Sequence, residues 1–307
     1  MNSDVNKDIN NNRPLGIDVH ADDYGLTMHT SKRILEGIEA GKLDSVSIMP
    51  NMDCFEEANA LWKANEATSN IKISVHLNFM EGYCLADPQE LSMFVNAEGL
   101  FVCSWIELTK INYDLTKRKK AKEQLKKEIL AQINRVGEAY ELDMKALRID
   151  SHQHSHMISW ILEALLEVAN ENGYSFEYIR NVKEWFLPYL KQVSLLSSYS
   201  PINIVKVLIL NWFAFWDKSK LKDISGSQMV ISGVFMSGMM DIKRVNRVIP
   251  AYYKRAGKKS LCLELLFHPG QAFEDEVKTE FNHNDNNCFY LSDNRNVEYE
   301  AMMGWML

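Results

Sequence analysis

Short apolar segments alternate with helical segments through most of the chain, and this alternation limits the fold more than any other sequence feature. The periodicity predicts helices over residues 30–40, 54–65, 117–140, 160–172, 242–253 and 297–306. The expected strands are residues 15–21, 45–49, 71–75, 146–149, 178–180, 229–232 and 260–267. Strands that alternate with helices pair in parallel through right-handed crossovers. The 307 residues suit one α/β barrel of roughly 250 residues plus insertions, with an open Rossmann-like sheet as the alternative.

The chain is expected to divide into a short leader and one folded domain. Residues 1–13 are polar and rich in Asn, and they lack the apolar segment of a signal peptide, which predicts a flexible leader. Residues 14–307 form the single domain, with a helical insertion at 183–227 whose aromatic side chains wall a pocket or bury a dimer contact. Its apolar run, residues 202–216, is too short to span a bilayer. The irregular residues 88–109 are predicted to be a functional loop or lid.

Composition excludes several classes of protein. A net charge of −7 argues against a nucleic-acid partner, and the basic residues 117–122 are interpreted as the solvated face of a helix. The five cysteines are odd in number and widely spaced, without a C-x-x-C pair. Such cysteines indicate unpaired thiols in a reducing compartment. We therefore expect a cytoplasmic protein without a nucleic-acid or membrane partner, and a homodimer is one of the oligomeric states left open.

The polar residues of greatest chemical interest follow the ends of predicted strands. In barrels and open α/β folds the carboxyl ends of parallel strands are where active sites form. This placement on four or five strands is the strongest functional signal in the chain. The residues concerned are Asp22, Asp23, His76, Asp150, His152, Arg180 and His268.

Three histidines stand within five residues, in the segment D-S-H-Q-H-S-H at 150–156. If the strand continued, His152, His154 and His156 would share one face and enter one cavity. If the chain turns after Asp150, only one or two of them would. Imidazole is both a common metal ligand and an acid–base group, so the segment predicts a metal site, with a solvated histidine-rich turn as the plainer interpretation.

The adjacent carboxylates Asp22 and Asp23 suit a division of labour, because consecutive side chains diverge and one can bind a metal while the other reaches water. Taken alone the pair is more typical of a helix N-cap. Beside His76 and the histidine segment it favours a metal site, because one Asp and two His leave open positions on a divalent ion. Water bound there can attack a carbonyl, and His268 is placed to protonate a leaving amine, although the Pro-Gly that follows it is also a turn signal.

Four motifs stand out: H-A-D-D-Y-G at 20–25, H-L-N-F-M-E-G at 76–82, D-S-H-Q-H-S-H at 150–156 and F-H-P-G at 267–270. Together they resemble the YdjC/ChbG-type carbohydrate deacetylases over residues 15–272. This resemblance implies a distorted, TIM-like (β/α) barrel of seven or eight parallel strands that removes acetyl groups from N-acetylated sugars such as chitooligosaccharides. It implies metal ligands at Asp23, His76 and His152, a catalytic base at Asp22, and makes His268 a plausible acid.

The metal and the substrate contacts are less closely defined. The family implies Mg²⁺, whereas two imidazoles and one carboxylate favour Zn²⁺ or Mn²⁺ on ligand softness. Asn78, Asp150, His154 and Arg180 are expected to contact an acetylated sugar. Tyr24 replaces the usual Phe, and the insertion at 183–227 has no counterpart in the family pattern, so a substrate other than chitobiose is an open alternative.

Two rival functions remain at this point. One is a metallohydrolase of another ester, amide or phosphoester class, but such barrels carry a His-x-His pair after the first strand, where this chain has carboxylates. The other is a non-catalytic protein that binds a metal or a sugar, which would need the metal ligands but not Asp22.

Overall fold

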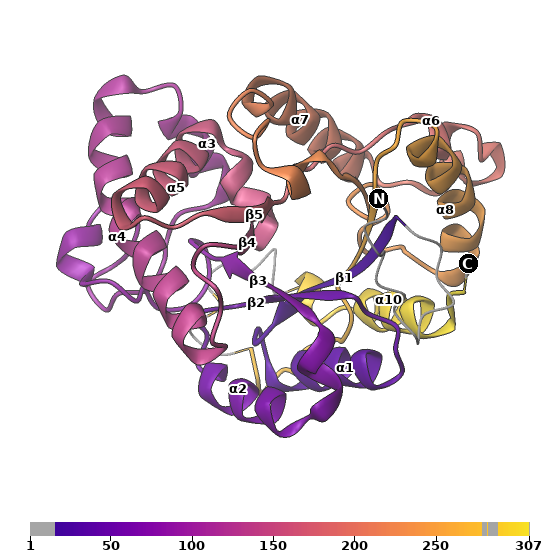
Figure 1. Cartoon of the computed structure of the whole chain (residues 1–307), viewed down its shortest axis with the longest axis horizontal. Helices are drawn as coiled ribbons and strands as arrows, with labels where there is room; N and C mark the ends of the chain where they lie inside the picture. The colour runs from indigo at the N-terminus through magenta and orange to yellow at the C-terminus, as the bar shows by residue number, and fades with distance from the viewer. Residues whose placement is uncertain (1–15, 278–280, 282–287, 307) are drawn as a thin grey trace, which may run out of the picture.

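A computed structural model describes residues 16–277, 281 and 288–306, so the expected leader at 1–13 lies outside the described residues. Seven parallel strands form one curled sheet in the order β5-β4-β3-β2-β1-β7-β6, with helices around its outside (Figure 1). The strands are β1 (Ile17–Tyr24), β2 (Ser45–Ile48), β3 (Lys72–Leu77), β4 (Leu147–Ser151), β5 (Phe176–Ile179), β6 (Val230–Ser232) and β7 (Leu263–Phe267).

The first strand pairs with both the second and the last. Ile17 to Ala21 lie opposite Leu263 to Phe267 of β7, and His20 lies opposite Ser45 of β2. Read around the circle, the order is therefore sequential from β6 through β7 and β1 to β5, which is the order of a barrel and not of a Rossmann-like sheet. The prediction of a distorted barrel is confirmed, with seven strands.

The helices agree with the predicted periodicity, with two corrections. The helix predicted over residues 242–253 continues past Pro250 to Gly257. Residues 88–109 were expected to be irregular, but they include a 3₁₀ turn, Pro88–Leu91, and most of α3. The α-helices are α1 (Met28–Glu39), α2 (Phe55–Ala64), α3 (Trp105–Ile111), α4 (Leu115–Ala139), α5 (Ser159–Asn172), α6 (Leu187–Leu190), α7 (Pro201–Asp217), α8 (Ile242–Gly257) and α10 (Asn294–Gly304).

The barrel is incomplete between β5 and β6, which do not pair with each other in the described part of the chain. A single backbone hydrogen bond, from Ile231 N to Lys183 O at 3.3 Å, crosses this gap. The buried carboxylate of Glu184, which follows β5, also links the two sides of the gap. It accepts hydrogen bonds from the backbone N–H groups of Gly233 and Phe235, after β6, at 2.8 Å each. Burial raises the pKa of Glu184 to about 7.

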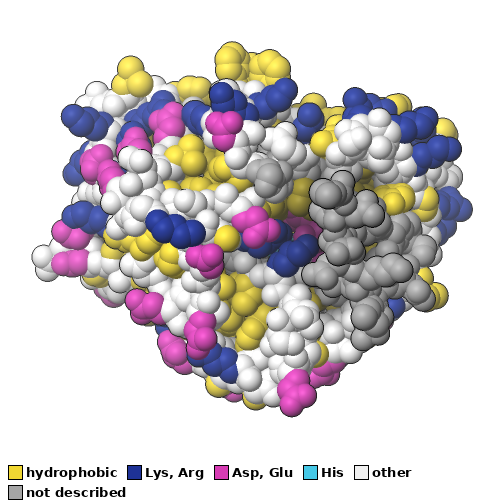
Figure 2. Space-filling model, in the orientation of Figure 1, with side chains coloured by type: hydrophobic (Ala, Val, Ile, Leu, Met, Phe, Trp, Pro, Cys, Tyr) yellow, Lys and Arg dark blue, Asp and Glu magenta, His cyan; other side chains and the backbone are white. Residues whose placement is uncertain are grey.

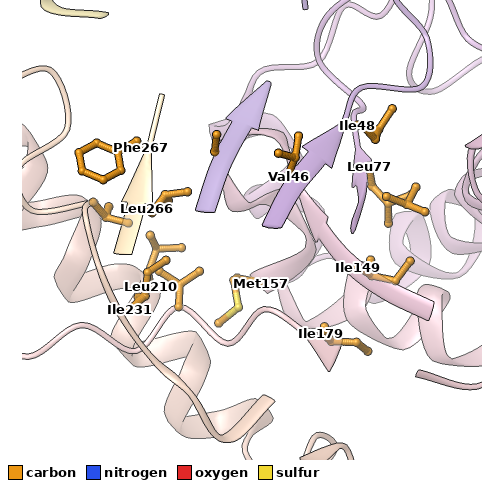
Figure 3. Close-up of a cluster of buried hydrophobic side chains, with 14 of the residues drawn as sticks. Val46, Ile48, Leu77, Ile149, Met157, Ile179, Leu210, Ile231, Leu266 and Phe267 are labelled. Atoms are coloured by element: carbon orange, nitrogen blue, oxygen red, sulfur yellow. The ribbon is translucent and has the colours of Figure 1, made fainter. Parts of the chain in front are cut away.

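The helical insertion contributes apolar side chains that fill the gap between β5 and β6. In Figure 3, Leu210 of α7 and Met157 lie between Ile231 of β6 and Ile179 of β5. All four side chains are buried. Within residues 183–227 lie α6, α7 and a 3₁₀ segment, Val193–Ser198, and the inner face of α7 lines the gap between β5 and β6. No helix of the described residues is long and apolar enough to cross a membrane.

Candidate active site

The strand-end prediction holds for every residue it named. Asp22 and Asp23 lie in the last three residues of β1, so the N-cap interpretation is wrong, and Thr27 caps α1 instead. Asp23 has a positive φ of 73°, a conformation that few residues other than glycine adopt. The other predicted residues end or follow their strands: His76 in β3, Asp150 in β4, His152 after β4, Arg180 after β5 and His268 after β7.

Asp23, His76 and His152 converge as one buried cluster. Asp23 Oδ1 lies 3.0 Å from His152 Nδ1 and 3.4 Å from His76 Nε2. Donors that share one ion at about 2.0–2.2 Å are themselves about 3.0–3.4 Å apart. The three side chains therefore fit a single divalent ion, and a carboxylate with two imidazoles is a donor set that zinc and manganese accept.

Each member of this cluster is held by a second partner on its other side. Asp150 Oδ1 contacts His76 Nδ1 at 2.6 Å, and the Tyr290 hydroxyl contacts His152 Nε2 at 2.7 Å. Arg295 donates to the second oxygen of Asp23 at 2.9 Å. Partners of this kind fix the tautomer and orientation of metal ligands. The structure thus leaves His76 Nε2, His152 Nδ1 and Asp23 Oδ1 facing one another.

The charge of the cluster favours a cation. Burial alone would lower the pKa of His76, but the carboxylates of Asp22, Asp150 and Asp23 raise it to about 10. Burial opposes the ionisation of Asp23, yet His152 and Arg295 hold its pKa well below the usual range. A site that draws a proton this strongly also attracts a metal ion, which competes for the same nitrogen lone pairs.

A second group of potential ligands, His20, Asp22 and Asp150, lies beside the first. Here the guanidinium of Arg180 already supplies the positive charge. Its Nη1 and Nη2 contact the two oxygens of Asp22 at 2.9 Å each, and Nη2 lies 3.1 Å from Asp150 Oδ2. His20 is bound by Ser45 and Ser47 at 2.6 Å. We conclude that this group holds Asp22 in place and is not a second metal site.

Arg180 is committed to carboxylates on three strands. Besides Asp22 and Asp150, it donates from Nε to Glu264 of β7 at 2.7 Å, and Tyr178 of β5 donates to the same carboxylate. Burial opposes the ionisation of Asp22, but Arg180 and then His76 hold its pKa well below the usual range. Arg180 therefore keeps Asp22 charged and fixes its orientation.

His268 lies beside Asp22, with Nε2 3.8 Å from Oδ2. On its other side, Nδ1 lies 3.4 Å from Glu298 Oε2, and the backbone N–H of His268 donates to the same oxygen at 2.7 Å. Burial alone would lower the pKa of His268, but Glu298 and then Asp22 raise it. The imidazole is thus stabilised in its protonated form.

The histidine segment turns after Ser151, as the second of the two sequence alternatives requires. Gln153 and His154 have positive φ angles of 52° and 58° within the 3₁₀ segment η3 (His152–Met157). His156 contacts Ser151 Oγ at 2.5 Å and the Arg180 carbonyl at 2.7 Å, so it supports the backbone. His154 is buried, which lowers its pKa well below the usual value, and its Nδ1 has no hydrogen-bond partner among the described residues.

Asn78 shapes the loop after β3. Its side-chain oxygen Oδ1 accepts hydrogen bonds from the backbone N–H groups of Met80 and Glu81. Its side-chain Nδ2 donates to Asn51 Oδ1 at 2.9 Å and to the Glu81 carbonyl at 2.7 Å. The side chain is buried. These bonds leave little of Asn78 available to a substrate.

Sequence reasoning missed the residues that support the ligands. His20 and Glu264 lie inside strands, where a polar residue carries no turn or loop signal, although His20 opens the motif H-A-D-D-Y-G. Tyr290, Arg295 and Glu298 come from the C-terminal segment, far along the chain from the motifs. Arg295 and Glu298 are distinguished only by their burial, which is unusual for charged residues of a helix. That burial is seen only in the folded protein.

Comparison with known proteins agrees with this fold. The model of the YdjC-like protein family matches residues 17–305, and the chain belongs to that family. Carbohydrate deacetylases are among its relatives: that of Thermoanaerobacter pseudethanolicus is 28% identical over 153 residues, which cover 50% of this chain and 56% of the relative. That of Vibrio campbellii is 31% identical over 152 residues, covering 50% and 54%. The chain thus spans about half the length of the curated relatives it matches.

A solved structure shows the same fold across the whole domain. It is that of a protein from Enterococcus faecalis V583, described as a candidate cellobiose-phosphate cleavage protein. The two share a TM-score of 0.62 and 15% sequence identity, over 94% of this chain and 90% of the other. At this identity the likeness concerns the fold alone.

Proposed function

We propose that this protein is a metal-dependent hydrolase that removes N-acetyl groups from carbohydrates of the chitooligosaccharide type or related amino sugars. The observation that carries the proposal is the convergence of Asp23, His76 and His152 directly beside the ionised Asp22. Membership of the YdjC-like family, and relatives named carbohydrate deacetylase, support the same activity. The odd number and wide spacing of the five cysteines, without a C-x-x-C pair, support a cytoplasmic location.

Asp23, His76 and His152 would hold the divalent ion. The family implies Mg²⁺, but the two imidazoles favour Zn²⁺ or Mn²⁺. A bound ion would polarise the acetyl carbonyl and lower the pKa of water. Asp150 then acts on the ligand His76 and not on the sugar, because its Oδ1 is taken by the imidazole at 2.6 Å.

Asp22 is proposed as the base that takes a proton from the attacking water. Its neighbour Asp23 is a ligand, so its carboxylate stands beside the site where that water must lie. Arg180 holds both oxygens of Asp22 at 2.9 Å, and each oxygen keeps a second lone pair for a proton. We assign Arg180 as a positioning residue in place of the substrate contact that the sequence favoured.

His268 is proposed as the acid that protonates the departing amine nitrogen. Glu298 keeps the imidazole charged, so a proton is present when the C–N bond breaks. One turnover leaves Asp22 protonated and His268 neutral. Their separation of 3.8 Å is short enough for the proton to pass from one to the other, directly or through one water, which restores both groups.

His154 is proposed to contact the sugar. Its ring is buried beside Asp22 and His268, and burial keeps it neutral. Its Nδ1 has no hydrogen-bond partner among the described residues, so it offers a hydrogen bond to a hydroxyl or amide of the substrate.

The direct test is acetate release from a panel of N-acetylated sugars, measured with and without a chelator and after addition of Mg²⁺, Mn²⁺ or Zn²⁺. We expect release that the chelator abolishes and one of the ions restores. A protein that binds the ion but releases no acetate from any sugar would contradict the proposal. Parallel assays with ester and phosphoester substrates would then separate another hydrolase from a non-catalytic binding protein.

A further inference from the structure

Helix α7 (Pro201–Asp217) is apolar on the outside as well as on the inside. Its inner face packs into the core through Val207, Leu210 and Phe213. A helix that is apolar all round is normally buried on every side, yet the outer face of α7 has no cover in the described structure. The exposed apolar side chains of this outer face are Ile202, Val205, Leu208, Trp212, Phe215 and Trp216.

These side chains are unusually large and unusually exposed. Phe215 is 70% exposed, and Trp212 and Trp216 are each 58% exposed. Figure 2 shows hydrophobic side chains projecting from the upper edge of the molecule, where Figure 1 places α7, with Lys and Arg side chains to both sides. Contiguous exposed apolar surface of this kind marks a contact with a partner or a membrane.

The charge around this face is opposite to that of the protein as a whole. Residues 187–222 contain five lysines and one aspartate, a net charge of +4, whereas the whole chain carries −7. Lys220 is neutralised by Asp217 and Glu163. Lys206 and Lys218 are exposed and form no ion pair within the described part of the chain. A partner that complements this face is therefore both apolar and anionic.

We propose that the outer face of α7 binds peripherally to the surface of an anionic lipid bilayer. Trp and Phe side chains enter the boundary between headgroups and acyl chains, while lysines on and beside the helix contact anionic headgroups. The sequence predicted no membrane partner because residues 202–216 are too short to span a bilayer, but a helix that lies in the interface does not need to span it.

A second copy of the chain fits this face less well. A two-fold interface places the same patch on both partners, so Lys206 and Lys218 of each copy would approach those of the other. Charge complementarity therefore selects the bilayer.

The position of α7 connects this surface with the candidate active site. Helix α7 contacts η3, the segment that carries His152 and His154. At its other end, the Asn203 amide donates to the Ser237 carbonyl in the loop after β6 at 2.8 Å. Bilayer binding through α7 would therefore hold the mouth of the barrel close to the membrane surface.

The test is sedimentation of the full-length protein with phosphatidylcholine vesicles prepared with and without phosphatidylglycerol. We expect binding that requires phosphatidylglycerol and weakens with added salt. The triple variant Trp212→Ser, Phe215→Ser, Trp216→Ser should bind at least about 100-fold more weakly, from the loss of three buried aromatic side chains. Met306→Ser is the matched control, because Met306 is 81% exposed and does not lie on α7, and it should bind as the unchanged protein does.

A second pair of variants keeps the test valid if the triple variant does not fold. Lys206→Gln and Lys218→Gln change only exposed charges, and each should weaken binding about five-fold. The proposal is overturned if the unchanged protein does not bind phosphatidylglycerol vesicles, or if the variants bind as tightly as it does. It is also overturned if light scattering finds a dimer that the triple variant converts to a monomer without any vesicle binding, since α7 would then contact a second copy.

Discussion

The two carboxylate–histidine clusters at the mouth of the barrel contain the same residue types but differ in what balances their charge. Around Asp22, Arg180 contacts both carboxylate oxygens, so the positive charge belongs to the protein itself. Around Asp23, Arg295 contacts only Oδ2, and Oδ1 faces His76 and His152. Two consecutive aspartates thus differ because of their neighbours: both oxygens of Asp22 contact an arginine, whereas one oxygen of Asp23 faces two imidazoles.

Replacing one histidine from each cluster should separate them most clearly. His76→Gln removes a proposed ligand, so we expect bound metal to fall from about one ion per chain to almost none. His20→Gln is the matched control, because it changes an equally buried histidine in the other cluster and should leave the metal in place. Elemental analysis after dialysis measures both. If His20→Gln lost the ion and His76→Gln kept it, the two clusters would have to exchange roles.

Asp22→Asn should divide catalysis from metal binding. The amide keeps the shape of the side chain but cannot take a proton, so acetate release should fall by roughly 10²–10⁴-fold while metal content stays near that of the unchanged protein. Acetate release at saturating metal measures the loss, and thermal unfolding checks that Arg180 still packs. Near-normal deacetylation by this variant would mean that Asp22 is not the base and that Asp150 or His154 takes the proton instead.

Tyr290→Phe tests the support of the Asp23 cluster alone. The change removes the hydroxyl that contacts His152 Nε2, and loss of such a partner weakens metal affinity by about 10–100-fold. Tyr178→Phe is the control in the other cluster, where the hydroxyl donates to Glu264, and its metal affinity should not change. Calorimetric titration with the ion gives both values. Equal affinities for the two variants would argue against His152 as a ligand.

Glu298→Gln should have the smallest effect, seen as a shift with pH. Glu298 raises the pKa of His268, so the protonated acid persists to higher pH in the unchanged protein. Without the carboxylate the pKa of His268 falls, and the high-pH loss of kcat/KM should begin at lower pH. The pH profile of kcat/KM measures this shift. An unmoved basic limb would mean that His268 is not the acid.

The sequence predicted the parts of the site that local patterns mark. Apolar runs located the strands, and Asp22, His76 and His152 followed from their positions at strand ends. The direction of the histidine segment could not be settled, because it depends on the positive φ angles of Gln153 and His154, which the fold imposes.

No local sequence pattern marks the gap between β5 and β6 or the residues that support the proposed ligands. Arg295 and Glu298 appear in the sequence as ordinary polar residues of an amphipathic helix, and only tertiary packing buries them against β1 and β7. In the same way Glu184 shows its role only when it accepts the backbone N–H groups of Gly233 and Phe235 in the loop after β6. Contacts between distant segments set these roles, so single-sequence periodicity does not report them.

The pairing of Asp23 with Arg295 also has a consequence for the order of events during synthesis. The two residues are 272 positions apart, and ribosomes add about 5–20 residues per second. Arg295 is therefore synthesised roughly 15–55 seconds after Asp23. For most of that time the edge of β1 also lacks β7, and contacts so distant in sequence are slow to form. The nascent chain must therefore remain unaggregated with an unsatisfied first strand, and Asp23 acquires its contact with Arg295 only after α10 has been translated and docked.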